Sequence, residues 1–97
     1  SGVMRVTWSL RAQDDFNIIY RQALDDDARY ALDLVSALEK AIARLSELPQ
    51  IGAPVGSADH RKWRMVRTPF LIIYRAGDQG LHILRVLHER QDWSIEP

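Results

Sequence analysis

The sequence predicts an α+β domain with the element order β-α-α-β-β-β: an N-terminal strand, an antiparallel helical hairpin and a three-stranded antiparallel meander, with the helices packed on one sheet. Three observations carry this prediction. Apolar and polar residues alternate at the start of the chain, apolar residues then recur every three or four positions, and strand-like runs separated by turn residues fill the second half. The 97 residues suffice for one domain with one modest core.

We expect this domain to span residues 4–97, because residues 1–3 resemble a scar left by expression cloning and Met4 resembles a natural start. Hydrophobic residues make up 46% of the chain and charged residues 27%, which argues against a disordered or fibrous protein. No apolar run or secretory signal suggests a membrane, so the cytoplasm is the expected compartment. With no cysteine and three scattered histidines, we expect neither a metal site nor a cofactor.

The first strand is expected over residues 4–8, where apolar and polar side chains alternate. Ser9 follows as a cap for the first helix, whose apolar residues recur at helical spacing as far as Ala23. The aspartates at positions 25–27 end this helix and begin the next, because carboxylates are favoured by the free amides and the dipole of a helix N-terminus.

The second helix is the clearest element, with apolar residues every three or four positions from Ala31 to Leu48 and Pro49 to stop it. The short link makes the two helices antiparallel neighbours. Residues 50–60 have the Gly, Pro, Ser and Asp content of an exposed loop.

Three strands are expected to follow, over residues 63–68, 70–76 and 81–87, separated by turn signals. The middle strand contains the continuously apolar run FLIIY, which indicates a central strand covered on both faces over part of its length. Strict alternation of the last strand would put Leu81, Ile83, Arg85 and Leu87 on one side.

A basic segment lies between His60 and Arg75. It holds five cationic side chains and no acidic one, namely Arg61, Lys62, Arg64, Arg67 and Arg75. Such a patch favours an anionic partner, either acidic protein or nucleic acid; the alternative is a solvated strand face.

The closing segment RVLHERQDW, residues 85–93, concentrates charge near the end of the chain. Alternation puts Arg85 and His88 on opposite faces, so a shared catalytic site would require a bulge or a turn after Leu87. Trp93 could pack back on the sheet or contact a partner, and we favour packing.

Other aromatic and histidine side chains have simpler readings. Trp8 and Trp63 are expected in the core because indole rings bury large areas. We expect His82 to be packed or at the rim of a strand face, and His60 to be solvated in its loop.

Four motifs in this order resemble the ParE branch of the RelE/ParE toxins of bacterial type II toxin-antitoxin systems. They are WSxxAxxD at residues 8–15, LxxxPxxG at 45–52, RxVxxPFxIxYR at 64–75 and ILRVLHxRQDW at 83–93. The resemblance covers nearly the whole chain and implies a toxin that a cognate antitoxin holds inactive. ParE-like members are associated with poisoning DNA gyrase, whereas RelE-like members share the fold but cut mRNA on the ribosome, so the fold alone cannot choose between them.

An RNase that attacks through the 2′-hydroxyl needs a base, an acid and cations around the phosphorane. Where the RelE pattern carries an arginine on the third strand this chain has Leu71, and where that pattern carries a terminal tyrosine the nearest residue is Trp93. Catalysis would then rest on Arg85, His88 and Arg90. We therefore favour gyrase inhibition without a catalytic residue; mRNA cleavage, an inactive homologue and a stand-alone interaction domain stay open.

The resemblance also implies the partners. We expect a ParD-like, DNA-binding antitoxin whose C-terminal tail wraps the toxin, DNA gyrase as the target, no membrane contact, and no direct nucleic-acid binding outside the complex. The groove for the tail is expected at the helical hairpin and a sheet edge. The residues expected to touch the target or the antitoxin are Arg61, Arg64, Arg67, Arg75, His88, Arg90 and Trp93.

Overall fold

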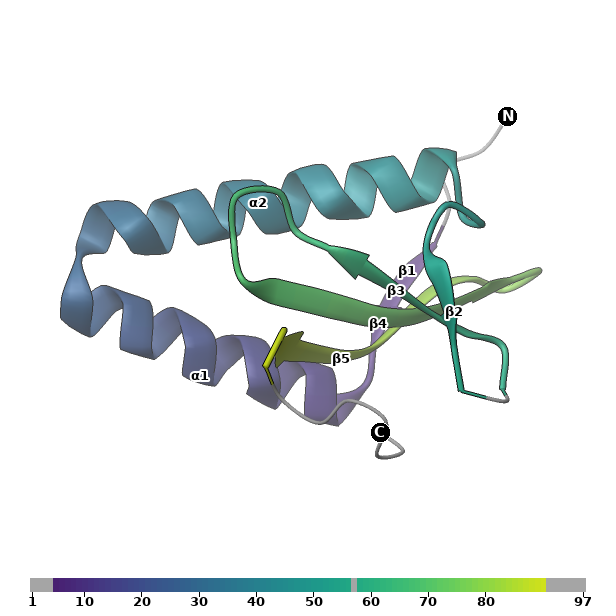
Figure 1. The fold of residues 1–97 in the computed structure, drawn as a ribbon, viewed down its shortest axis with the longest axis horizontal. Coiled ribbons are helices and arrows are strands. Elements are labelled where there is room, and N and C mark those ends of the chain that lie inside the picture. The colour runs from purple at the N-terminus through teal and green to yellow at the C-terminus, as the bar shows by residue number, and fades with distance from the viewer. Residues whose placement is uncertain (1–4, 57, 91–97) are drawn as a thin grey trace.

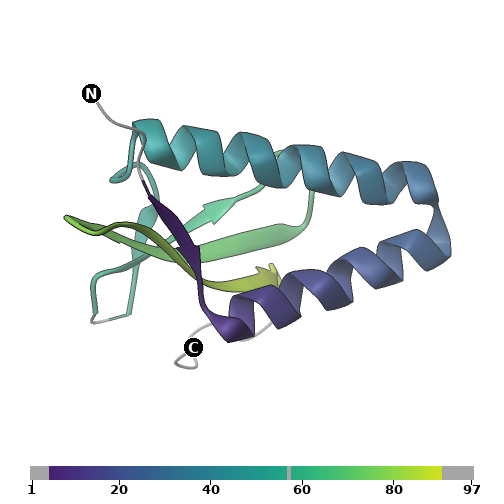
Figure 2. The same ribbon diagram turned by 180° about the vertical axis from the view of Figure 1, so that it is seen from behind.

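The computed structural model describes residues 5–56 and 58–90. The elements in chain order are β1 (Val6–Trp8), α1 (Leu10–Asp26), α2 (Ala28–Glu47), β2 (Ala53–Val55), β3 (His60–Arg64), β4 (Phe70–Gly77) and β5 (Gly80–His88). The strands form one sheet in the order β1-β5-β4-β3-β2. Figures 1 and 2 show the hairpin of α1 and α2 closing at one end of the molecule, with the sheet lying toward its open end. The predicted α+β fold is confirmed.

Two details of the predicted sheet are wrong. Residues 50–60 are not a simple loop, because β2 lies within them and pairs antiparallel with β3. This strand was not predicted because it contains Pro54, and proline argues against a strand except at the edge of a sheet, where β2 lies. The next strand is displaced from residues 63–68 to β3, because Met65 to Thr68 turn back on themselves: the Thr68 N–H donates to the Met65 carbonyl at 3.2 Å.

The predicted caps at Ser9 and Asp27 are confirmed, whereas Asp25 and Asp26 lie inside the last turn of α1. The Ser9 hydroxyl accepts a hydrogen bond from the Ala12 N–H at 3.0 Å. Asp27 both ends α1 and begins α2, and its carboxylate accepts from the Arg29 N–H at 2.9 Å. At the other end of α2, Leu48 closes the last turn directly before Pro49. Both helices therefore start and stop where their local sequence chemistry requires.

The core lies between the helical hairpin and one face of the sheet. The prediction that FLIIY is central is confirmed, since β4 is the middle strand and Leu71 to Tyr74 are buried. Tyr74 and its neighbour Ile72 point toward the helices, where they pack with fully buried residues such as Leu34 and Leu45. Trp8 and Trp63, expected in the core, are half-buried and pack against its margin.

A bulge in β5 corrects the expected alternation of that strand. Tyr74 lies opposite Ile83, whereas Ile73 lies opposite Arg85, so Leu84 is the extra residue. Ile83 and Arg85 consequently point to opposite faces instead of sharing one. Residues 81, 83 and 86 face the helices, and residues 85 and 87 face away from them, on what we call the outer face of the sheet.

The Tyr74 hydroxyl fastens the segment that follows α2. It donates to the Pro49 carbonyl at 2.8 Å and accepts from the Gly52 N–H at 3.0 Å. Arg61 holds the same segment, donating to the Gln50 and Gly52 carbonyls at 3.1 and 2.7 Å. Burial raises the pKa of the Tyr74 hydroxyl, partly offset by its bond to Gly52 and the charge of Arg61. Pro49 and Gly52 of the LxxxPxxG motif are therefore hydrogen-bonded to Tyr74 of the RxVxxPFxIxYR motif.

Gly52→Ala should unfold the protein more easily, because a Cβ there would lie 2.5 Å from the Tyr74 hydroxyl oxygen and 2.7 Å from the Lys62 carbonyl oxygen. We expect a loss of about 1–3 kcal/mol in the free energy of unfolding by urea titration. Gly77→Ala is the matched control, because nothing lies within 4 Å of its added Cβ. Equal losses in the two variants would contradict the proposed close packing.

Tyr74→Phe should cost about 1–3 kcal/mol, because the Gly52 N–H and the Pro49 carbonyl lose their partner. Because the pKa of Tyr74 is raised in the folded state, its contribution is fully present below its ordinary pKa of 10.0 and is lost as the pH rises beyond that value. Urea titrations between pH 8 and 11 should give a steeper alkaline decline for the native protein than for Tyr74→Phe. Tyr30→Phe, at an exposed helix position, controls for the removal of a hydroxyl.

Candidate functional site

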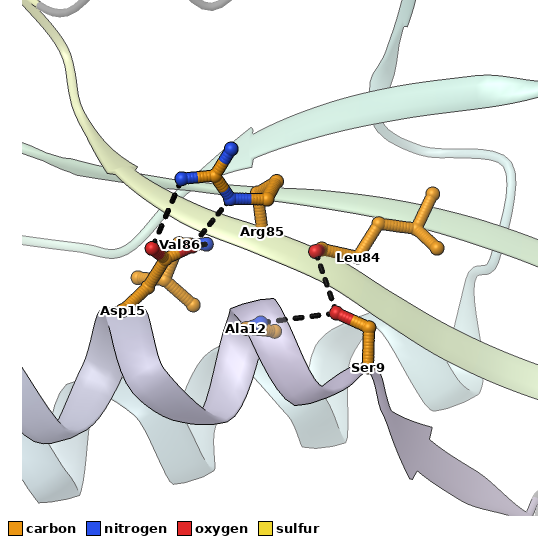
Figure 3. Close-up of polar contacts among 6 residues, drawn as sticks. All are labelled: Ser9, Ala12, Asp15, Leu84, Arg85 and Val86. Atoms are coloured by element: carbon orange, nitrogen blue, oxygen red, sulfur yellow. Dashed lines mark hydrogen bonds and ion pairs between the residues drawn. The ribbon is translucent and has the colours of Figure 1, made fainter. Parts of the chain in front are cut away.

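The candidate site is the second half of β5 with the helix beside it. Within the described residues, β1 pairs in parallel only with residues 81–83 of β5, and no described strand neighbours the rest of that edge. The start of α1 occupies that edge. The Ser9 N–H donates to the Ile83 carbonyl at 2.9 Å. The Ser9 hydroxyl donates to the Leu84 carbonyl at 2.8 Å, as Figure 3 shows. Ser9 therefore joins the helix cap to the sheet edge.

Asp15, two turns into α1, completes this junction from the same side. Its carboxylate accepts from the Val86 N–H at 3.0 Å, from the Arg85 Nε at 2.7 Å and from a terminal Arg85 nitrogen at 3.0 Å (Figure 3). The Arg85 and Asp15 side chains are only 18% and 15% exposed. The hydrogen bonds that Arg85 donates to Asp15 raise the pKa of Arg85, and this effect outweighs the lowering effect of burial. The edge of the Arg85 guanidinium that can form two parallel hydrogen bonds is therefore already bound to a carboxylate of its own chain.

His88 lies at the end of β5, on the opposite face from Arg85, as the strand alternation predicted. Its ring meets the Phe70 ring edge to face, with centroids 5.5 Å apart. The His88 Nδ1 accepts from the Arg90 N–H at 3.0 Å. Arg90 itself is exposed in the turn after β5. The three residues named for RNase chemistry are consequently divided between two faces and a turn.

The basic segment does not form one continuous patch. Arg61 faces the loop after α2, and Arg67 sits in the turn before β4 with a left-handed backbone, φ 62°. Arg64 and Arg75 point to the outer face. Arg64 lies 3.6 Å from the Glu89 carboxylate, but both side chains are well exposed, so this pair contributes only about 0–1 kcal/mol.

Two further positions named from the sequence complete the site. Leu71 is buried and lies in register between Arg64 and Leu87, so an apolar side chain fills the place where the RelE pattern has a cation. Trp93 lies outside the described residues. In the described ranges, no group of three or more His, Cys, Asp or Glu side chains is arranged to hold a metal ion. No helix among those residues is long and apolar enough to cross a membrane.

No role was predicted for Asp15 or Tyr74 from the sequence. Asp15 falls within the WSxxAxxD motif, which was the only available signal, but its partners are 70 and 71 positions away in the chain. His60 was expected in a loop, yet it begins β3 and is half-buried. His82 fits its prediction as a rim side chain: it is half-buried and its Nδ1 lies 2.5 Å from the Thr7 hydroxyl oxygen.

Comparison with known proteins assigns the chain to a family. Residues 6–93 match the family described as the ParE toxin of the type II toxin-antitoxin system parDE. The chain is 33% identical over 85 residues to Toxin RelE1 of Caulobacter vibrioides, covering 82% of this chain and 87% of that protein. The protein therefore belongs to the ParE toxin family, within the RelE/ParE superfamily of type II toxin-antitoxin toxins.

Two solved structures share the fold. The chromosomal ParDE system of P. aeruginosa contains a chain of the same fold, with a TM-score of 0.72 over 91% of this chain and 98% of that one, at 24% identity. The toxin-antitoxin complex RelBE2 of Mycobacterium tuberculosis contains another, with a TM-score of 0.59 over 89% and 91%, at 25% identity.

Asp15→Asn should destabilise the protein, because the amide cannot hold both the Arg85 guanidinium and the Val86 N–H as a carboxylate does. We expect a loss of about 2–3 kcal/mol in the free energy of unfolding. Asp14→Asn is the matched control, since Asp14 is the exposed neighbour on the same helix. A loss no larger than that of the control would show that the junction contributes nothing to stability.

Proposed function

We propose that this toxin inhibits DNA gyrase, so that replication stops, and that a ParD-like antitoxin neutralises it. One observation carries the choice of target. Arg85, the arginine that an RNase of this family would turn toward a phosphate, is held by both oxygens of Asp15. To stabilise the phosphorane, the guanidinium would first have to leave this carboxylate. Breaking that buried ion pair costs free energy, which would add to the activation barrier of RNA cleavage.

The other described candidates do not compensate for this loss. His88 lies on the opposite face of β5 from Arg85. The two side chains therefore cannot reach the same substrate group unless β5 rearranges. Leu71 supplies no charge. An inhibitor that acts by binding its target does not need these side chains to meet at one site. It needs only an exposed surface, such as the turn that carries Arg90.

A ribosome-dependent mRNA endonuclease is the second candidate. The similarity to a protein named Toxin RelE1, and the shared fold with the RelBE2 complex, favour it. In that case His88 and Arg90 would carry the chemistry together with a released Arg85, and the protein would be an enzyme.

The antitoxin tail is proposed to occupy the groove between α2 and the turn before β4. Tyr30, Ala37, Val66 and Arg67 line this groove, and Val66 is 60% exposed although it is apolar. An amphipathic helix with apolar anchors and an acidic residue near Arg67 would match these side chains. At the β2 edge, Pro54 has no N–H to offer, so this edge is a poor template for an added strand.

Arg64→Glu and Arg67→Glu test the role of the arginines in antitoxin binding. We expect Arg67→Glu to weaken the complex at least about tenfold, because it turns an attractive pair into a repulsive one at the groove. Isothermal titration with the cognate antitoxin measures this, and Arg21→Glu on α1 controls for net charge. Unchanged affinity in both arginine variants would exclude these contacts.

Pulse-labelling of cells after toxin induction separates the two target assignments. Gyrase inhibition predicts that DNA synthesis stops first and that purified toxin blocks supercoiling. Purified toxin should then cut no mRNA on ribosomes, with or without the His88→Ala change, because no proton transfer is involved. If protein synthesis stopped first and His88→Ala abolished mRNA cleavage, the endonuclease would replace the gyrase inhibitor.

A further inference from the structure

A regular row of side chains runs along the side of α1 that faces away from the core. Its members follow one another at steps of four, three, four and three residues, and they are Leu10, Asp14, Asn17, Arg21 and Leu24. Because a helix turns by about 100° per residue, this spacing keeps them within about 80° of each other around the helix. We call these residues the α1 seam.

The α1 seam is exposed and takes no part in the fold. Ala12 and Ala23, the buried residues of α1, point to the opposite side of the helix. Every seam residue is exposed, and Leu10, at 77%, is the most exposed large apolar residue of the described ranges. The side chains of Asp14, Asn17 and Arg21 make no hydrogen bond or ion pair with any described residue. Figures 1 and 2 show α1 along one margin of the molecule, where a partner can reach it.

The charges of the seam are complementary to the same seam read in reverse. Asp14 stands three residues before Asn17, and Arg21 stands four residues after it. If a second copy of α1 lies antiparallel, with the two-fold axis beside Asn17, Asp14 of each copy meets Arg21 of the other. The leucines at the two ends of the seam meet in the same way. One helix face therefore supplies both halves of an isologous contact.

The flanking charges favour the same arrangement. Arg11 and Asp25 are exposed beside the two ends of the seam. The charges along this face therefore alternate as plus, minus, plus and minus, and reversal of the helix changes the sign at each place. A parallel pair would instead bring like charges together, which is destabilising. Ile18, which is 57% exposed, adds apolar surface beside the two-fold axis.

Other occupants match this face less well. The carboxylates of Asp14 and Asp25 would repel an anionic lipid surface or a nucleic acid. A helix of another protein could cover the two leucines. The reversal of charge about Asn17, however, is a property that only a second copy of the same helix requires.

We propose that the α1 seam is a self-association surface on which a second copy of this chain docks antiparallel. The helix has 17 residues and is about 25 Å long. One helix pair of this length buries less than the roughly 1,600 Å² of a standard interface, so the dimer should be weak, with a micromolar dissociation constant. The seam and Asp15 lie on different sides of α1, so this inference goes beyond the proposed function and does not depend on it.

Sedimentation velocity of the purified full chain between about 1 and 300 μM tests the proposal. The native protein should change from monomer to dimer across this range. Leu10→Arg should weaken the dimer about tenfold or more, because it puts a charge where two leucines meet. Leu32→Arg is the matched control, since Leu32 is 66% exposed but lies on α2.

A charge exchange separates pairing between copies from a general effect of charge. Asp14→Arg and Arg21→Asp should each weaken the dimer about threefold or more, because each brings like charges together. The double variant restores the opposite pairs and should return the dissociation constant to within about twofold of the native value. Circular dichroism of each variant checks that the fold is kept.

Single cysteines report the direction of the second helix, because the native chain has none. Asn17→Cys, beside the two-fold axis, should form a disulfide-linked dimer under mild oxidation. Leu10→Cys should not, because fourteen residues of helix, about 21 Å, would separate its two copies, whereas a disulfide spans at most about 7 Å between Cα atoms.

Four results would overturn the proposal: a native chain that stays monomeric, equal losses in Leu10→Arg and Leu32→Arg, no recovery in the double variant, or equal cross-linking of the two cysteine variants. A monomeric native chain whose antitoxin affinity falls in Leu10→Arg would assign this face to the antitoxin instead. Neither gyrase nor ribosomes are present in these measurements, so failure here leaves the proposed target assignment standing.

Discussion

The carboxylate of Asp15 is the interaction on which the other features of the structure depend. Three hydrogen bonds converge on it, two from the Arg85 guanidinium and one from the Val86 N–H. They join a helix near the start of the chain to a strand near its end. An open strand edge exposes unpaired backbone groups, and a buried arginine without a partner lowers the stability of the fold. The Asp15 carboxylate pairs with both the Val86 N–H on that edge and the Arg85 guanidinium.

The bulge at Leu84 makes this arrangement possible. By reversing the alternation, it turns Arg85 away from the core while Val86 enters it, and it presents the Val86 N–H to α1. Ser9 contributes from the same helix end, since its hydroxyl caps α1 and its contacts reach β5. The cluster that first resembles a catalytic site in the sequence is therefore, in large part, the joint between helix and sheet.

This joint also explains how one superfamily fold can host different activities. The scaffold needs the helical hairpin, the meander and the Tyr74 contact that fastens the segment after α2, and none of these specifies chemistry. What differs is which side chains the outer face presents. Here an apolar Leu71 and a carboxylate-bound Arg85 lie on that face.

The sequence predicted what local chemistry controls. Ser9 and Asp27 indicate helix starts because capping depends on residues within one turn, and the apolar run of β4 indicates a central strand because residues 71–74 are buried. It could not predict the Asp15 contacts, whose partners are 70 or more positions away, nor the bulge, which leaves no signature in the alternation of β5. β2 was missed for a related reason: its proline and short length are permitted only by its edge position.

Hydrogen exchange at the Val86 N–H tests the central claim most directly, because this amide has no strand partner on the side of α1 and depends on Asp15. The account predicts that Val86 exchanges as slowly as the amides of β4 in the native protein, and roughly a hundredfold faster in Asp15→Ala while the β4 amides stay protected. Fast exchange of Val86 in the native protein, or unchanged protection in Asp15→Ala, would contradict it.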